Sequence, residues 1–163
     1  MDFYYPNFIN DHWRLEGQIF FGDKNHFVDH AAKRFKIDEI IAFCQEKGFA
    51  FFDTSTAIRR LQDNASDKFL EVVEPTDIRG LLHQLPHCRA IVTTGEKATD
   101  TICASLGIPS IPKVNTSVVI PDTNNNEGDQ ILLYRLPSSS RAYPLSFDKK
   151  VEAYQQMFKQ VLD

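Results

Sequence analysis

Hydroxyl and basic side chains that can hold an anion gather near the end of the chain. Three consecutive serines follow Pro137, and an arginine comes directly after them. Two lysines stand further on, where a segment with helical hydrophobic spacing begins. Because the amino terminus of a helix carries partial positive charge, lysines there are unfavourable unless an anion lies nearby. The position of Lys149 and Lys150 therefore indicates a phosphate nearby, whereas the run of serines at Ser138, Ser139 and Ser140 before Arg141 would, taken alone, be merely a loop.

Three further polar residues are candidates for a ligand site. Asn10 can donate and accept hydrogen bonds together, although an asparagine before Trp13 can equally cap a helix. Asp53 follows the apolar run 49–52, where its carboxylate can also cap neighbouring backbone. Thr94 follows another apolar run, and a turn hydroxyl is its favoured role.

Metal and disulfide chemistry find little support in the sequence. His26 and His30 have the spacing of metal ligands on a helix, but no third ligand follows at a suitable distance, so surface histidines are favoured. The cysteines are odd in number and form no CxxC pair, which favours reduced core thiols. We therefore expect no metal and no organic cofactor.

The composition is that of an ordinary globular protein. The chain has 163 residues, 42% hydrophobic and 25% charged, which fits a single domain over residues 1–163. The net charge of −4 excludes a generally basic nucleic-acid coat, so any DNA contact must come from a local patch. No apolar run has the length of a membrane span and no signal peptide is recognisable, which predicts a cytoplasmic protein without a membrane partner.

The elements that must position these residues alternate between strands and helices. This alternation predicts a layered α/β sandwich with a largely parallel sheet, whose ligands bind beyond the carboxyl ends of the strands, where Asp53, Thr94 and Ser138 stand. The expected helices are 23–35, 38–47, one opened by 75–77 and closed by Pro86, 96–106, and a last one capped by Ser146 with Phe147, Val151, Tyr154, Phe158 and Val161 on one face; the expected strands are 49–52, 90–92, 117–120 and 131–133.

Four blocks, in order along nearly the whole chain, carry a family resemblance. They are Tyr4-Tyr5 with Asn10-Asp11-His12-Trp13; the run 48–53, Gly-Phe-Ala-Phe-Phe-Asp, with Ser66-Asp67 and Asp77; the run 90–98, Ala-Ile-Val-Thr-Thr-Gly-Glu-Lys-Ala; and Leu136-Pro137-Ser138-Ser139-Ser140 with Lys150-Val151-Glu152-Ala153-Tyr154. In these blocks the chain resembles the uracil-DNA glycosylase superfamily, in the branch of mismatch-specific uracil/thymine and DNA-deoxyinosine (hypoxanthine) glycosylases. The last block is the most specific. Thr94 stands where the deoxyinosine group often has Asn.

The resemblance implies a three-layer α/β/α sandwich with a mainly parallel central sheet and a monofunctional DNA glycosylase. Such an enzyme flips a deaminated base, hypoxanthine first and uracil second, out of DNA and hydrolyses its N-glycosidic bond. Tyr5 would be the flat surface under the base, with Thr94 and Asp53 beside it, and Asn10 would read the base edge or hold the water. The serine turn, Arg141, Lys149 and Lys150 would hold DNA phosphates, and Ser140 or Arg141 would enter the gap left by the base.

One part of the family pattern is absent. The family begins with a strand and a Gly-x-x-Pro turn, and in uracil-active members that turn brings the residue that positions or activates water. The resemblance therefore implies a chain truncated at its amino terminus relative to the family. Two alternatives stay open: a glycosylase-like module that binds damaged or single-stranded DNA without catalysis, and a nucleoside- or nucleotide-handling α/β enzyme. The preferred base and the oligomeric state also stay open.

Overall fold

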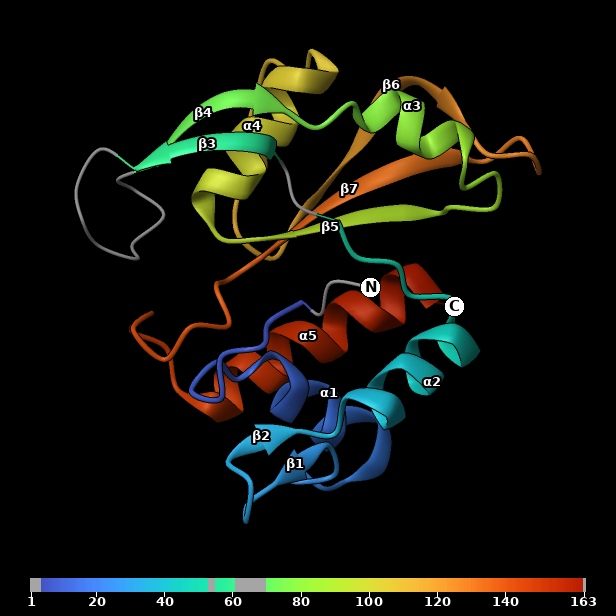
Figure 1. The fold of residues 1–163 in the computed structure, drawn as a ribbon. Helices are drawn as coiled ribbons and strands as arrows, with labels where there is room; N and C mark the ends of the chain where they lie inside the picture. The colour runs from blue at the N-terminus through green and yellow to red at the C-terminus, as the bar shows by residue number, and fades with distance from the viewer. Residues whose placement is uncertain (1–3, 53–54, 61–69, 163) are drawn as a thin grey trace. The chain divides into compact units, whose positions relative to one another are not determined.

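The computed structural model of the protein describes residues 4–52, 55–60 and 70–162, and of 55–60 and 70–75 it gives the backbone alone. This part of the chain is mixed α/β (Figure 1). The chain divides into a first unit, Met1–Phe52 with Ser138–Gln160, and a second unit, Asp53–Pro137 with Val161–Asp163. The expected single domain over residues 1–163 stays a prediction, and each unit is described by itself.

Three helices and a short hairpin build the first unit. Its elements are α1 (His12–Phe21), the antiparallel pair β1 (Val28–Asp29) and β2 (Arg34–Phe35), α2 (Ile37–Lys47) and nearly all of α5 (Phe147–Leu162). Both α1 and α2 end at a glycine in the left-handed region, Gly22 with φ 68° and Gly48 with φ 75°, a conformation that glycine adopts without strain.

An aromatic core holds this unit together. Its buried members are Trp13, Phe27, Val28, Phe35, Ile40, Phe43 and Cys44, and the half-buried Tyr5, Phe8, Phe20, Phe49 and Phe51 pack against them. Many of these rings meet edge to face, such as Trp13 and Phe27 at a centroid distance of 6.3 Å and an interplanar angle of 80°. Aromatic pairs in this geometry contribute roughly 0.5–1.5 kcal/mol beyond the apolar area that they bury.

Two sequence-based expectations for this unit are wrong. The stretch 23–35 is not a helix but turns followed by the β1–β2 hairpin, because Asp23 and Asp29 accept hydrogen bonds from the backbone of Asn25 and Ala32 and so form turns. The stretch 49–52 is not a strand. Phe49 instead donates its backbone N–H to Cys44 O at the end of α2, and its ring packs into the aromatic core.

A three-stranded mixed sheet is the framework of the second unit. The strand order is β5-β7-β6, in which β5 (Ala90–Thr94) runs parallel to β7 (Gln130–Leu136) and β6 (Ser117–Asn124) runs antiparallel to it. A separate antiparallel pair is formed by β3 (Ser55–Arg60) and β4 (Leu70–Pro75), and the helices are α3 (Ile78–His83) and α4 (Glu96–Leu106). Among the described strands, a mainly parallel sheet is therefore not seen.

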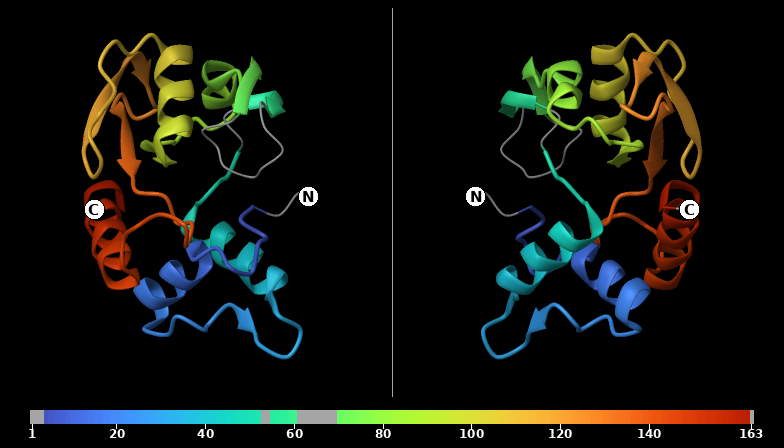
Figure 2. Two further views of the ribbon diagram at one scale, coloured as in Figure 1. Left: turned by 90° about the vertical axis from the view of Figure 1, so that its left-hand side faces the viewer. Right: turned by 90° about the vertical axis from the view of Figure 1, so that its right-hand side faces the viewer.

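The apolar core of the second unit lies on one face of this sheet. Figure 2 shows α3 and α4 on that face, with the β3–β4 pair beyond them. The buried residues come from both layers and are Ile78, Ile102, Cys103, Leu106, Ile120, Ile131 and Leu133. Thr93 of β5 and Thr99 of α4 add a buried hydroxyl pair at 2.8 Å, so the strand and the following helix are tied by packing and by a hydrogen bond.

Candidate functional site

The serine turn after β7 is hydrogen-bonded to the segment that precedes α1. The backbone N–H of Asp11 donates to Ser139 O at 3.1 Å, and the Ser139 hydroxyl donates to Asn10 Oδ1 at 2.9 Å. Asn10 and Ser139 are 129 positions apart in sequence, and both belong to the first unit. The structure therefore brings together two of the residues that the sequence singled out.

Asn10 combines the two roles weighed for it. Its Oδ1 also accepts from the backbone N–H of His12 at 2.9 Å and so satisfies a donor at the start of α1. This donor fixes the orientation of the amide, because an N–H must face an oxygen. Within the described residues, Nδ2 of the half-buried Asn10 makes no hydrogen bond, so the amide keeps a donor for a ligand.

Lys150 differs from its predicted place on the surface. Its side chain is 1% exposed, and Nζ donates to Ser140 O at 2.8 Å and lies 3.9 Å from Asp11 Oδ2. Burial lowers the pKa of Lys150; Asp11 opposes this shift and Arg141 adds to it. A buried ammonium requires such partners. In this structure Lys150 therefore holds the turn from inside instead of facing a phosphate.

The other residues of the turn divide into buried and exposed groups. Ser139 is 2% exposed, whereas Ser138 and Ser140 are half-buried and use their hydroxyl oxygens to accept from the backbone of Ser140 and Ala142. The Arg141 side chain is 51% exposed, and its Nε donates to Asp11 Oδ1 at 3.0 Å. Among the predicted cations, a phosphate in solution would therefore first meet Arg141 and the exposed Lys149.

Helix α5 places the two lysines on different sides. Ser146 accepts at its hydroxyl from the backbone N–H of Lys149 at 3.3 Å, which confirms the predicted cap. The buried residues of the helix are Lys150, Ala153, Tyr154 and Met157, whereas the predicted apolar face was Phe147, Val151, Tyr154, Phe158 and Val161. The buried face is thus rotated by about one position, because the core takes up the stem and ammonium of Lys150.

Tyr5 has an uncommon backbone conformation and an aromatic partner. Its φ is 53°, in the left-handed region that bulky residues rarely adopt. Its ring stacks on that of His12 at a centroid distance of 4.2 Å and an interplanar angle of 15°. The preceding carbonyl, that of Tyr4, accepts from Trp13 Nε1 at 2.9 Å, which anchors this segment on α1. Two parallel rings thus form an aromatic platform on the first unit.

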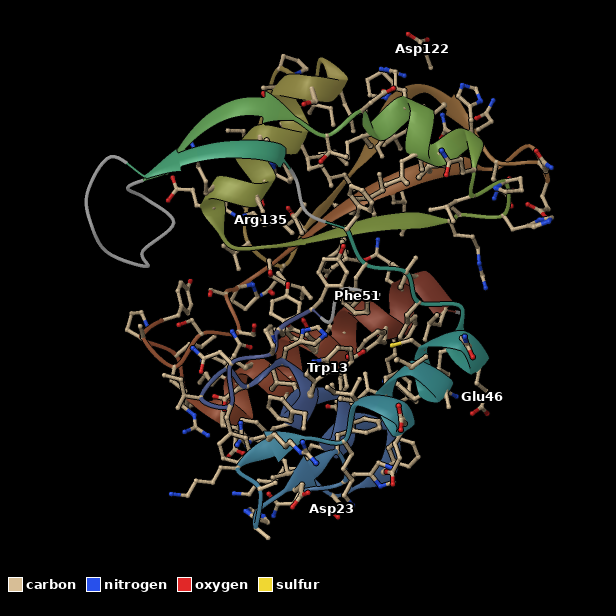
Figure 3. The ribbon with its side chains drawn as sticks, in the orientation of Figure 1. Trp13, Asp23, Glu46, Phe51, Asp122 and Arg135 are labelled. Atoms are coloured by element: carbon tan, nitrogen blue, oxygen red, sulfur yellow. The ribbon has the colours of Figure 1, made fainter. Side chains whose placement is uncertain are left out.

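Two polar residues of α1 were missed in the sequence. His12 and Glu16 are both buried, and His12 Nε2 lies 2.8 Å from Glu16 Oε2. Figure 3 labels Trp13 and Phe51, whose rings both meet His12 edge to face. The signal in the sequence that could have found the pair is its i,i+4 spacing, which places both side chains on one face of a helix.

Two further residues, Thr94 and Asp53, were expected beside the base. Thr94 is the last residue of β5, half-buried and paired with Leu136 at the carboxyl end of the parallel β5–β7 pair, and it belongs to the second unit. Gly95 follows with φ 86° and begins α4. Asp53, Ser66 and Asp67 lie outside the described residues.

Comparisons with known protein families, with curated proteins and with solved structures found no match for the chain. Within the ranges that the structure describes, no three His, Cys, Asp or Glu side chains are placed to share a metal ion. None of the helices in those ranges combines the length and apolar composition needed to cross a bilayer. Clues to the function therefore come from the chain's own residues and their geometry.

Proposed function

We propose that the protein is a DNA glycosylase that hydrolyses the N-glycosidic bond of deaminated bases, hypoxanthine first and uracil second. The observation that carries the proposal is the link between residues 10–11 and Ser139 through two hydrogen bonds. By the resemblance, residues 10–11 would lie at the flipped base and the turn that contains Ser139 would bind the DNA backbone. Their direct connection supports this assignment, because an enzyme that flips a base must couple its grip on the backbone to its pocket.

The chemistry follows from the side chains of the first unit. A flipped base needs a flat partner, which the Tyr5–His12 stack supplies. Asn10 Nδ2 is the donor for the base edge or for the attacking water. Water would attack the sugar carbon C1′ while the bond to the base nitrogen breaks, and the leaving base takes up a proton. Backbone dipoles and DNA phosphates would stabilise the oxocarbenium-like transition state.

Few charged side chains would bind the DNA phosphates. Arg141 and Lys149 are the exposed cations of the candidate region, and an acidic protein needs such a local patch for phosphates. The proposal includes DNA with deaminated or mismatched bases as the partner, action in the cytoplasm, and the three-layer α/β/α sandwich with a mainly parallel sheet that the resemblance implies.

A module that binds damaged or single-stranded DNA without catalysis is the second candidate. It is favoured by the use of Asn10 Oδ1 in two structural hydrogen bonds, which leaves half of the amide for chemistry. This candidate predicts salt-dependent binding of DNA with an abasic site or a mismatch and no release of a base.

The test is base release from labelled DNA. Duplexes and single strands that contain hypoxanthine, uracil or xanthine are incubated with the protein and then treated with alkali, which cleaves abasic sites. We expect alkali-dependent product, no strand cleavage without alkali, and a loss of about 100-fold or more in Asn10→Ala. Asn25→Ala, an exposed asparagine of the same unit, is the matched control and should keep full activity. No product at stoichiometric protein would exclude the enzyme.

A further inference from the structure

We propose that Asp11 and Lys150 are positioning residues, which hold the Ser139–Arg141 turn in the shape that presents the Arg141 guanidinium to a DNA phosphate. The inference rests on the proposed function and extends it, because neither residue touches the DNA in this arrangement. The five residues involved, Asp11, Lys150 and the three of the turn, all belong to the first unit.

Asp11 contacts both ends of the turn. It is 7% exposed, its backbone N–H donates to Ser139 O at 3.1 Å, and its Oδ1 accepts from Arg141 Nε at 3.0 Å. One residue thus fixes the main chain where the turn begins and the side chain where it ends. A carboxylate that is this buried is costly unless it is paired, so its position is defined by these contacts.

Lys150 fixes the middle of the turn. Its Nζ donates to Ser140 O at 2.8 Å and lies 3.9 Å from Asp11 Oδ2, so the ammonium bridges the turn and the aspartate. At its other end the residue is held in α5, where its backbone N–H donates to Ser146 O at 3.0 Å. The turn is therefore braced against the start of a 16-residue helix.

The contacts of Asp11 and Lys150 with the turn together form a brace, which leaves one edge of Arg141 available. Nε is taken by Asp11, whereas within the described residues the two terminal nitrogens make no hydrogen bond, and the side chain is 51% exposed. Because a guanidinium is planar, anchoring Nε fixes the direction of the remaining donors. Such a fork matches two oxygens of one phosphate.

The charges around Asp11 also favour an anion. Three cations surround this one carboxylate, with Arg14 Nη1 at 4.0 Å in addition to Arg141 and Lys150. Burial and the charge of Arg141 lower the pKa of both Arg14 and Lys150. A phosphate at Arg141 would offset this excess of positive charge.

The direction in which Asp11→Asn changes DNA affinity distinguishes a positioning role of Asp11 from a purely electrostatic one. If Asp11 acted only as a negative charge near DNA, Asp11→Asn would strengthen binding, because it removes repulsion with the phosphates. If Asp11 positions Arg141, the same substitution weakens binding. Lys150→Met gives the companion test, since it keeps the apolar stem of the buried side chain and removes the ammonium.

The first measurement is the affinity for a duplex with an abasic site at low salt. We expect Asp11→Asn and Lys150→Met each to bind about tenfold more weakly than the unchanged protein. Asp148→Asn and Lys159→Met make the same charge changes at exposed positions of α5 and should stay within about twofold. Stronger binding by Asp11→Asn would overturn the proposal.

The second measurement is amide hydrogen exchange without DNA. Ala142 and Tyr143 donate backbone hydrogen bonds to Ser140, so their exchange reports on the turn. We expect about tenfold faster exchange at these amides in both variants, with unchanged protection in α1 and α2 as the check that the unit is folded. Unchanged exchange of the turn would overturn the proposal, whether or not the protein binds DNA.

The exchange measurement also separates the two proposals. Faster exchange of the turn in a protein that binds no DNA would support the brace and overturn both the phosphate assignment and the proposed function. If a buried substitution unfolds the first unit, Arg141→Ala replaces it, because this exposed residue can be truncated without opening the core. Faster exchange at Ala142 in that variant supports the tie between Arg141 and Asp11, and unchanged exchange overturns it.

Discussion

Glu16 shows how one buried carboxylate shapes its neighbours. It is 1% exposed, and its Oε2 lies 2.8 Å from Nε2 of His12 on the same helix. Burial, and after it the charge of Glu16, raises the pKa of Cys44 to about 12. The pKa of Tyr154 is also raised well above its ordinary value, by burial and then by Tyr5 and Glu16. The core of the first unit therefore favours the neutral forms of the Cys44 thiol and the Tyr154 hydroxyl.

Cys44 should make the stability of the protein sensitive to alkaline pH. The unfolded thiol has a pKa near 9.0 and the folded one a pKa of about 12, so its contribution to stability is complete below pH 9 and is lost as the pH rises toward 12. Between pH 8 and pH 11, the free energy of unfolding measured in urea should fall by on the order of 2 kcal/mol more in the unchanged protein than in Cys44→Ala. A difference in the free energy of unfolding between the two proteins that stays constant over this range would contradict the prediction.

At the scale of elements, α5 depends on its first turn. Ser146→Ala removes the hydroxyl that accepts from the Lys149 N–H, and we expect a loss of about 1 kcal/mol in the free energy of unfolding. Thermal or urea unfolding measures it. The control is Ser105→Ala, at an exposed position inside α4, which should be neutral or slightly stabilising because alanine is the better helix former. Equal effects at the two positions would mean that Ser146 is not a cap.

The elements that the sequence predicted well are those with a clear periodic pattern and a terminal signal. The predicted helices 96–106 and 38–47 match α4 and α2 to within one residue, and in the structure each helix ends at a glycine, Gly107 and Gly48. The hairpin was wrongly predicted as part of a helix over 23–35, and α1 was not predicted, because the aromatic-rich sequence around Pro6 that precedes it has no regular period. In such segments long-range aromatic packing decides the structure.

The candidate site stays a prediction, and the sequence did not indicate how its side chains are oriented. The serine turn and Asn10 were singled out, and the structure joins them. The burial of Lys150 was not foreseeable from local spacing, because its partner Asp11 lies 139 positions earlier in the chain (150 minus 11). For Asp11 itself, only its place beside Asn10 in the sequence suggested a role in the candidate site. Contacts of this length are invisible to patterns that span one helix or one strand.

On the scale of the whole molecule, the net charge of −4 limits the DNA contact to a small patch. With Arg141 and Lys149 as the exposed cations of that patch, the logarithm of the duplex affinity should fall with the logarithm of the salt concentration with a slope of about −2. Lys149→Ala should reduce the slope to about −1, and Lys24→Ala, an exposed lysine of the same unit, should leave it unchanged. A slope of about −6 would show that a larger surface binds DNA.

The link between Asn10 and Ser139 also has a consequence for how the protein is made. The first unit joins the beginning of the chain to a segment that leaves the ribosome 129 residues later. Closing a loop of this length costs about 4 kcal/mol of chain entropy, which only the finished aromatic core and the brace can offset. Most of the second unit lies between these two segments in sequence, and its central strand β7 ends at Leu136, directly before the turn. The hydrogen bond between Asn10 and Ser139 is therefore able to form only after residues 53–137 of the second unit have been synthesised.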